Sequence, residues 1–301
     1  MIKKVTGKLF NSITRKSRMK KISILIDNGL PIQMKSILNY LVTGHSDEKT
    51  AAVVKLAEGR RKEIAGKGDE KIPIWYSPKP DSSGSDTSIN ARPQPGKVLE
   101  FTMKRIAMTG KNQTWGTVLY LLAREFESSV GIELGTCAGI SSMYLSSAPN
   151  VKLIITVEGS EALANIARES LKSNQNVKVV NALFDEAIDF ELPSLDSKID
   201  MAFIDGHHEK IATIHYFNKI LPFLNPGSVV IFDDISWSHD MRDAWNILSN
   251  RNEFLHAMDL GELGVCIVKK RSDNPEMKPL YWDLQPIVGR RSIGDPHGWK
   301  E

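Results

Sequence analysis

Acidic and imidazole side chains follow two apolar segments of this sequence at the point where each segment ends. Asp205-Gly206-His207-His208 follows the first segment, and Asp233-Asp234 follows the second. Ionised carboxylates are costly to bury unless they bind something positive. Three such oxygen donors suit Mg²⁺ first, then Mn²⁺ or Ca²⁺, whereas zinc usually recruits more His or Cys. The alternatives are that Asp234 caps the next helix and that His207 is a structural histidine.

A second group of residues has the spacing of a cofactor-binding turn. Residues 130–134 read as a buried strand, Gly135 and Gly139 bracket a tight turn, and residues 140–145 begin a helix. Glycines let the backbone approach a ligand, and a helix N-terminus offers unpaired N–H groups. The turn lacks the G-x-G-x-x-G spacing of a dinucleotide site. Glu133, inside the strand, would repel a pyrophosphate but suits a cationic or amino-bearing ligand.

Two further strand ends offer groups that suit a nucleoside. Glu158 directly follows an apolar strand and could accept hydrogen bonds from two ribose hydroxyls. Ala182, Leu183 and Phe184 follow the next strand and suit the face of an adenine ring. A purely structural acid at a helix N-terminus is the alternative for Glu158.

The elements that must position these residues alternate regularly along the chain. Strands are expected at 130–134, 152–157, 177–181, 199–204, 228–232, 254–260 and 264–269, and helices at 140–147, 161–173, 184–189, 209–222 and 240–249. Strands separated by helices predict right-handed crossovers and a parallel sheet with both faces covered. The last two strands have hairpin spacing. We therefore predict a Rossmann-like, doubly wound α/β fold, with a mostly parallel seven-stranded sheet and an antiparallel last strand.

Segments outside this alternation divide the rest of the chain. Residues 1–76 are expected to form a helical N-terminal extension with a basic arm, and residues 77–97 a flexible linker or lid loop. The main domain then covers residues 98–270, with helical patterns at 98–108 and 115–126 before the first strand. Residues 271–301 are expected to be a C-terminal tail or a flap.

The charge of the chain is unevenly distributed. Residues 1–21 contain eight Lys and Arg and no acid, although the whole chain has a net charge of only +3. The remainder is therefore net negative, which argues against a generally basic nucleic-acid binder. The basic arm is either a solvated face or a peripheral membrane contact, with a transit peptide as a minor option.

The sequence lacks the marks of a secreted or membrane-spanning protein. It contains no apolar run of about 18 residues and no secretory signal pattern. Its two cysteines, Cys137 and Cys266, are interpreted as free thiols in a reducing compartment. A catalytic thiol is the alternative to a small buried side chain. We therefore expect a cytoplasmic location.

These motifs together resemble those of the class I S-adenosylmethionine-dependent methyltransferases. Within that class the sequence is most similar to the metal-dependent small-molecule O-methyltransferases of the catechol type and their bacterial relatives. The resemblance covers roughly residues 108–270. It rests on Glu133-x-Gly135-Thr136-x-x-Gly139, Glu158, Phe203-Ile204-Asp205-Gly206-x-His208 and Phe232-Asp233-Asp234-Ile235.

The resemblance implies that S-adenosylmethionine is the methyl donor. Glu133 would lie near its amino group and Ser141 near its carboxylate, while Glu158 would hold the ribose. The full set of residues implied to bind it is Thr109, Gly110, Glu133, Gly135, Thr136, Gly139, Ser141, Glu158, Ala182, Leu183, Phe184 and Asp205. Thr109 and Gly110 fall where the family closes a loop over cofactor and substrate.

The resemblance also implies a metal and a base. Asp205, Asp233 and Asp234 would hold the cation. Catechol-type enzymes have a lysine three residues after the first ligand, and this chain has His208, whose imidazole can accept a hydroxyl proton near neutral pH. His207, His239 or a metal-bound hydroxyl are alternative bases. Trp237 and His239 are candidate substrate-binding residues, with core packing as the alternative for Trp237.

We therefore expect transfer of a methyl group to a hydroxyl of a small molecule, assisted by a divalent metal. The alternatives are N-methylation of a small molecule, methylation of nucleic acid through the basic arm, and a non-catalytic binding protein of the same fold. Nucleic acid is the less expected partner, because no Asn-Pro-Pro-Tyr-type motif follows the fourth strand. A homo-oligomer is compatible with the sequence.

Overall fold

The centre of the molecule is an eight-stranded sheet with the order β10-β8-β9-β7-β6-β3-β4-β5. The computed structural model describes residues 2–76 and 97–289. The strands of this sheet are β3 (Val130–Leu134), β4 (Leu153–Glu158), β5 (Val177–Asn181), β6 (Ile199–Ile204), β7 (Leu224–Phe232), β8 (Phe254–Asp259), β9 (Gly264–Val268) and β10 (Leu280–Asp283). Only β9 runs against its neighbours, β7 and β8. The predicted doubly wound fold is confirmed.

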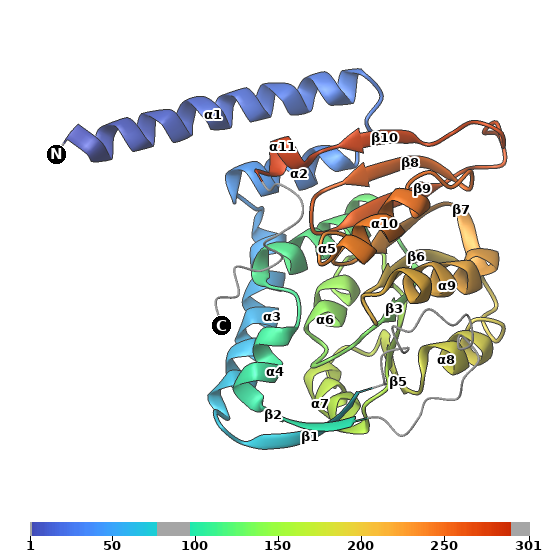
Figure 1. Cartoon of the computed structure of the whole chain (residues 1–301). Coiled ribbons are helices and arrows are strands. Elements are labelled where there is room, and N and C mark those ends of the chain that lie inside the picture. The colour runs from blue at the N-terminus through green and yellow to red at the C-terminus, as the bar shows by residue number, and fades with distance from the viewer. Residues whose placement is uncertain (1, 77–96, 290–301) are drawn as a thin grey trace.

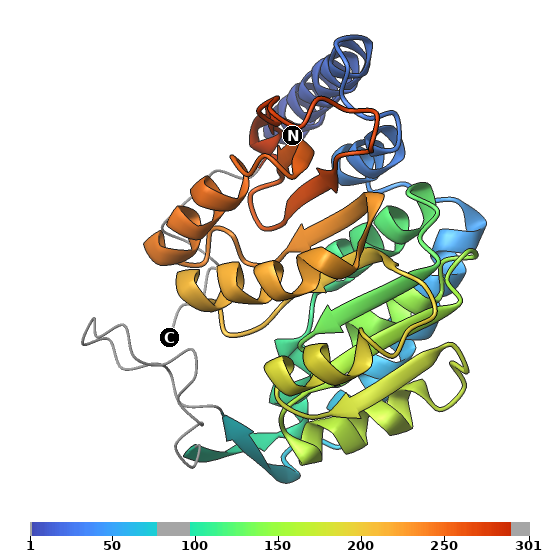
Figure 2. The same ribbon diagram turned by 90° about the vertical axis from the view of Figure 1, so that its right-hand side faces the viewer.

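Helices cover both faces of the sheet (Figure 2). One face carries α5 (Gln113–Glu125), α6 (Ile140–Ser146) and α7 (Glu161–Leu171), and the other carries α8 (Phe184–Glu191), α9 (Lys210–Ile220), a short 3₁₀ turn (Leu221–Phe223) and α10 (His239–Leu248). Side chains alternate between the faces along a strand. Val229 and Ile231 accordingly join the first core, and Val230 and Phe232 join the second.

One strand of the sheet was not predicted. All seven expected strands are present, but β10 adds an eighth from the segment expected to be a tail or flap. It pairs in parallel with β8 and leads into α11 (Gln285–Val288). β10 has only four residues, and Leu280 and Tyr281 are exposed. An edge strand this short gives no alternating pattern in the sequence. Residues 290–301 of the predicted tail lie outside the described residues.

The N-terminal extension contains the expected helices, which are α1 (Ile2–Asp27), α2 (Met34–Thr43) and α3 (Glu48–Gly66). Helix α1, which includes the basic arm, crosses one end of the molecule beside α2 and α11 (Figure 1). Helix α3 packs against α5 and α6, and its Ala57 and Ile64 are buried in the core on that face of the sheet. The extension is therefore built onto one face of the sheet. No helix among the described residues is long and apolar enough to cross a membrane.

The helix predicted over residues 98–108 is wrong in its first half. Residues 97–102 form strand β2 (Lys97–Thr102), which pairs antiparallel with β1 (Lys71–Tyr76), and only then does α4 (Met103–Thr109) begin. The hairpin buries Ile74 and Phe101 and exposes Val98, so its burial follows the strand period. Apart from Lys97, which begins β2, the predicted lid at 77–97 lies outside the described residues.

Candidate active site

The candidate site lies at the carboxyl ends of the parallel strands. From β3 the sheet continues through β4 and β5 on one side, and β6 and β7 lie on the other side. The strand order therefore reverses between β3 and β6. Open α/β sheets bind ligands at such a reversal, because the loops on either side diverge and leave a crevice.

The glycine turn after β3 is packed closely against the end of β6. Gly135 has a φ of +105°, and a Cβ atom built there would lie 2.0 Å from the carbonyl oxygen of Asp205. Its N–H donates to the carbonyl oxygen of Val157 at the end of β4, at 3.0 Å. Gly139, with a φ of +82°, begins helix α6. A side chain at Gly135 would push the two loops apart.

Glu133 is fully buried just before the turn. Its Oε2 accepts hydrogen bonds from the hydroxyls of Ser142 and Thr156, the second at 2.6 Å, whereas Oε1 has no hydrogen-bond partner among the described residues. Burial raises the pKa of this carboxyl, and the nearby hydroxyls, including that of Ser141, oppose the rise. A buried acceptor without a partner suits the N–H of a bound ligand. The Thr136 hydroxyl lies 2.6 Å from that of Thr156 and belongs to the same buried network.

Glu158 closes the other side of the turn. Its two carboxylate oxygens accept backbone N–H groups from Cys137 at 2.8 Å and Ser160 at 2.9 Å. Each oxygen keeps a further lone pair, so the group can still accept hydrogen bonds from hydroxyls. Burial raises the pKa of Glu158, and it raises that of the Cys137 thiol to about 12. A thiol so poorly ionised at neutral pH is not a nucleophile.

Phe184, one of the predicted adenine-side residues, lies in a cluster of aromatic rings. Phe184 contacts the rings of His207 and Tyr216 edge to face, with centroids 5.7 and 5.3 Å away. Its own ring lies against Gly206, where a built Cβ would be 2.3 Å from it. On the far side, Gly159 lies beside Leu183 and Trp75 of β1. Trp75 was not predicted, because the sequence places it outside the alternating elements.

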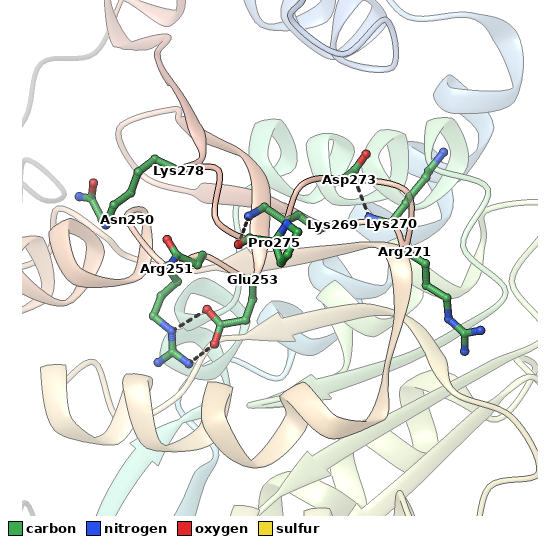
Figure 3. Close-up of a pocket in the computed structure, with 10 residues that line it drawn as sticks. Asn250, Arg251, Glu253, Lys269, Lys270, Arg271, Asp273, Pro275 and Lys278 are labelled. Carbon is green, nitrogen blue, oxygen red and sulfur yellow. Dashed lines mark hydrogen bonds and ion pairs between the residues drawn. The ribbon is translucent and has the colours of Figure 1, made fainter.

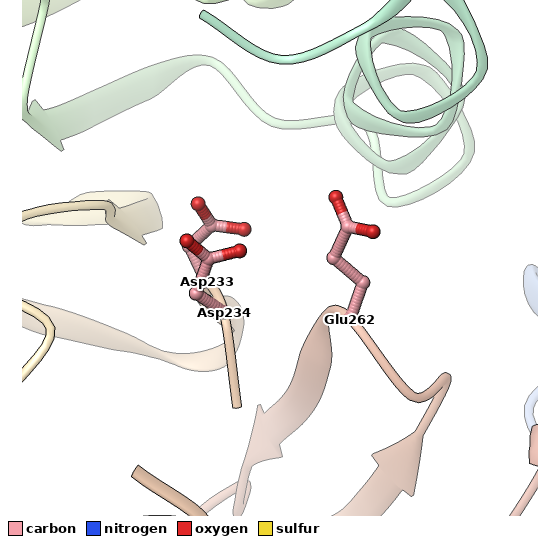
Figure 4. Close-up of side chains that lie close together, drawn as sticks. All are labelled: Asp233, Asp234 and Glu262. Atoms are coloured by element: carbon pink, nitrogen blue, oxygen red, sulfur yellow. The ribbon is translucent and has the colours of Figure 1, made fainter. Parts of the chain in front are cut away.

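Carboxylates converge after β7 and between β8 and β9. Figure 4 shows Asp233 and Asp234 next to each other, with Glu262 facing them from the turn between β8 and β9. One oxygen from each lies within 4.8 Å of the other two. Burial raises the pKa of Asp205 to about 6 and, with Asp205 and Asp234 as neighbours, raises that of Asp233 well above its usual range. Glu262 was not predicted, because it stands in a hairpin turn rather than at a parallel strand end.

An ammonium group occupies this acidic cluster. Lys111, in the loop between α4 and α5, places Nζ 2.5 Å from Asp233, 3.2 Å from Asp234 and 3.5 Å from Glu262. Burial would lower the pKa of Lys111, but the surrounding carboxylates raise it well above its usual value. Divalent cations lie about 2.0–2.6 Å from their oxygen ligands. Two of the three predicted ligands, Asp233 and Asp234, therefore lie together with Glu262. A metal has no place among these carboxylates while Lys111 is there.

His208 faces the cluster from the loop after β6. Its ring nitrogens lie 3.8 Å from Asp205 and 3.6 Å from Asp234, and its ring stacks on that of Trp237 with centroids 5.9 Å apart. The side chain is one-third exposed (33%), so a ligand can reach it. His207 is held differently, because Nδ1 lies 2.8 Å from the Tyr216 hydroxyl and burial lowers its pKa.

The loop predicted to close over the site, which includes Thr109 and Gly110, is bound by hydrogen bonds from helix α3. The Arg61 guanidinium donates to the carbonyl oxygens of Ala107 at 2.7 Å and Gly110 at 3.4 Å, and also to that of Lys111. Thr109 is exposed and donates to its own helix, and Gly110 lies beside Ile140 at the start of α6. Among the residues that the structure describes, no hydrogen bond, ion pair or ring contact joins His239 to the acidic cluster, and His239 is exposed at the start of α10.

A pocket elsewhere on the surface is unrelated to these groups. Figure 3 shows it between the segment before β8 and the segment after β9, at the opposite end of the strands from the candidate site. Its basic side chains include Arg251, which pairs with Glu253 at 2.7 Å, and Lys269, which donates to the carbonyls of Pro275 and Met277. These charges serve local structure.

Comparison with known proteins finds similarities for the core of the chain. Residues 132–235 match the family model described as a methyltransferase domain. The chain is 31% identical over 143 residues to an uncharacterized protein of Acanthamoeba polyphaga mimivirus, covering 43% of this chain and 64% of that one. It is 30% identical over 125 residues to a catechol O-methyltransferase of Niastella koreensis, covering 40% and 55%. It thus spans less than two thirds of both relatives.

A solved structure of an O-methyltransferase from Bacillus cereus, in complex with SAH, aligns with a TM-score of 0.46 and 22% identity. That alignment covers 56% of this chain and 88% of the other. Residues 132–235 are thus similar in sequence to a methyltransferase domain.

Proposed function

We propose that this protein transfers a methyl group from S-adenosylmethionine to a hydroxyl of a small molecule. The proposal rests on one juxtaposition, in which Glu133 with its partnerless Oε1 and Glu158 lie on either side of the Gly135 turn. Glu133 suits the donor's ammonium group and Glu158 its ribose hydroxyls. Ala182, Leu183 and Phe184 then border the adenine, and Ser141 lies near Glu133 for the donor's carboxylate.

The donor supplies an electrophilic methyl group, whose bond to sulfur breaks with the electron pair moving to sulfur as the new O–C bond forms. The residues of this chain align the acceptor, exclude water from the site and accept the proton of the acceptor hydroxyl. Alignment of this kind accounts for much of the acceleration in such reactions. The buried strand ends under Asp205 and Asp233 provide the dry surroundings.

His208 is the proposed general base. It is a third exposed, its ring nitrogens lie 3.8 Å from Asp205 and 3.6 Å from Asp234, and its ring stacks on that of Trp237. An imidazole in this position can take the acceptor's proton as the new bond forms. His207 is a poorer candidate, since the Tyr216 hydroxyl already occupies its Nδ1.

Metal assistance is a second candidate, favoured by one observation. Neither carboxylate oxygen of the buried Asp233 has a hydrogen bond of good geometry among the described residues, although Lys111 lies close. Asp205, Asp233, Asp234 and Glu262 would hold a divalent cation only after Lys111 had withdrawn. Such a cation would polarise the acceptor hydroxyl.

A compound with two neighbouring aromatic hydroxyls is the first acceptor to test, because of the similarity to a catechol O-methyltransferase. The partly exposed ring of Trp237 beside His208 suits a flat acceptor. A small primary amine of similar shape tests N-methylation instead.

Calorimetry with S-adenosylmethionine and its demethylated product tests the donor site. We expect binding by the wild-type protein and a loss of about 10-fold or more in Glu158→Ala, since two hydrogen bonds to a charged acceptor are removed. Mass spectrometry of mixtures with catechol and with the amine then identifies the methylated atom. Absence of donor binding by the folded wild-type protein would refute the proposal.

A further inference from the structure

The acidic cluster has a cation of its own, supplied by the chain. Among the described residues, Lys111 is the side chain whose ammonium group reaches Asp233, Asp234 and Glu262 together. The lysine is only 8% exposed, and the three carboxylates are 0%, 8% and 9% exposed. Ion pairs buried this deeply persist only where each charge is compensated. Removing Lys111 would therefore leave a group of carboxylates that needs another cation.

The position of Lys111 is fixed by a second layer of contacts. Arg61 donates to three carbonyl oxygens of the 107–111 segment, those of Ala107, Gly110 and Lys111 itself. Arg61 in turn pairs with Glu58 at 2.9 Å, and Glu58 accepts the hydroxyl of Tyr144 in α6 at 3.0 Å. These contacts hold the backbone of Lys111, so its position in the cluster is part of the packed structure and is not that of a flexible surface side chain. The N-terminal extension thus holds the backbone from which the ammonium group reaches the strand ends.

We propose that Lys111 replaces the divalent metal in this site, as a built-in cation positioned by Arg61. The protein then binds no divalent metal at Asp233, Asp234 and Glu262 in its native form. In the catalytic part, which rests on the proposed function, the ammonium group offsets the negative charge beside His208 and the acceptor oxygen. Methyl transfer is accordingly independent of added metal.

The test compares manganese binding in wild type, Lys111→Met and Lys111→Arg, by electron paramagnetic resonance with Mn²⁺ as the probe. Lys104→Met is the matched control, because Lys104 is exposed on the preceding helix. We expect no specific Mn²⁺ binding by wild type, Lys111→Arg or Lys104→Met. Lys111→Met should bind one Mn²⁺ at least about 10-fold more tightly than wild type, because the freed carboxylates take a cation. Its melting temperature should rise with Mn²⁺, and that of wild type should not.

Activity provides the second measurement. Turnover of the wild type should be unchanged by EDTA, and Lys111→Met should lose about 100-fold or more, as expected for loss of a charge at the reacting atoms. Specific Mn²⁺ binding by wild type, or loss of its turnover in EDTA, would overturn the proposal. So would a folded Lys111→Met protein that binds no Mn²⁺.

Two safeguards keep the result interpretable. If Lys111→Met does not fold, the wild-type measurements with Mn²⁺ and EDTA still decide the question. Calorimetry with S-adenosylhomocysteine is run on the same samples. Failure of the wild type to bind it would remove the proposed function, whereas the manganese measurements would still report whether Lys111 occupies the cation site.

Discussion

The guanidinium of Arg61 donates a hydrogen bond to the carbonyl oxygen of Lys111, so a helix of the N-terminal extension holds the loop that enters the acidic cluster. This contact links α3 to the loop between α4 and α5, and no sequence motif connects the two segments. It makes α3 part of the site's support, and it can be tested by removing the guanidinium.

Arg61→Ala should lower turnover more than donor affinity. The loss leaves three carbonyl oxygens without their donor and frees the Lys111 segment. We expect a stability loss of about 1–3 kcal/mol in urea unfolding, typical of polar groups left unpaired. The neighbouring Arg60→Ala is the control, since Arg60 binds Ser170 and the exposed Glu63 instead. Equal effects of the two substitutions on turnover would argue against a special role for Arg61.

Gly135→Ala should destabilise the protein by at least about 3 kcal/mol, because the new methyl group meets the Asp205 carbonyl and the φ of +105° is strained for alanine. Gly59→Ala, in the middle of α3 with nothing within 4 Å, should instead stabilise it by about 0.5–1 kcal/mol. Urea unfolding of both variants measures the contrast. A folded Gly135→Ala protein of wild-type stability would contradict the close packing of the two loops.

His208→Gln should lower the turnover number by about 100-fold or more while leaving donor binding intact, as for other general bases. The loss should shrink as pH rises, because hydroxide can take the acceptor's proton. His239→Gln, two residues beyond Trp237 and exposed, is the comparison and should keep its turnover. If the two variants lose activity alike, the base lies elsewhere.

Glu133 should give the unfolding free energy a pH dependence of predictable sign. Burial raises its pKa above the ordinary value of 4.5, so the folded protein keeps the proton at pH values where the unfolded chain has released it. The contribution of Glu133 to stability is thus full below pH 4.5 and falls as pH rises through the raised pKa. Glu133→Gln should show a flatter decline over that window in urea titrations at successive pH values. Parallel curves for the two proteins would mean that folding does not shift the pKa of Glu133.

The sequence was most informative where chemistry follows a buried strand. The apolar run ending at Ile204 and the one ending at Phe232 made Asp205 and Asp233 easy to place on one rim, because parallel strands end at a common edge. The same reasoning located Glu158 and the glycine turn. A residue that directly follows a strand lies at the end of that strand, so the sequence pattern alone is enough to predict where it lies in the fold.

Lys111, Glu262 and Arg61 could not be found in that way. Each lies in a loop, a hairpin turn or a distant helix, and each reaches the rim through tertiary packing alone. Trp75 was missed for a related reason, since its partner strand follows a long polar segment. The charge of Lys111 also changes the interpretation of the acids, from ligands awaiting a metal to partners of an internal cation.

Strand β10 has a consequence for the solubility of the folded protein. It covers the outer backbone groups of β8, a strand whose Phe254, Ala257 and Met258 are fully buried. Tyr281 and Gln285 fasten the covering segment to Asp259 at 3.0 and 3.1 Å. A chain cut before β10 would present the outer N–H and C=O groups of the six-residue strand β8, which is a template for edge-to-edge association between molecules.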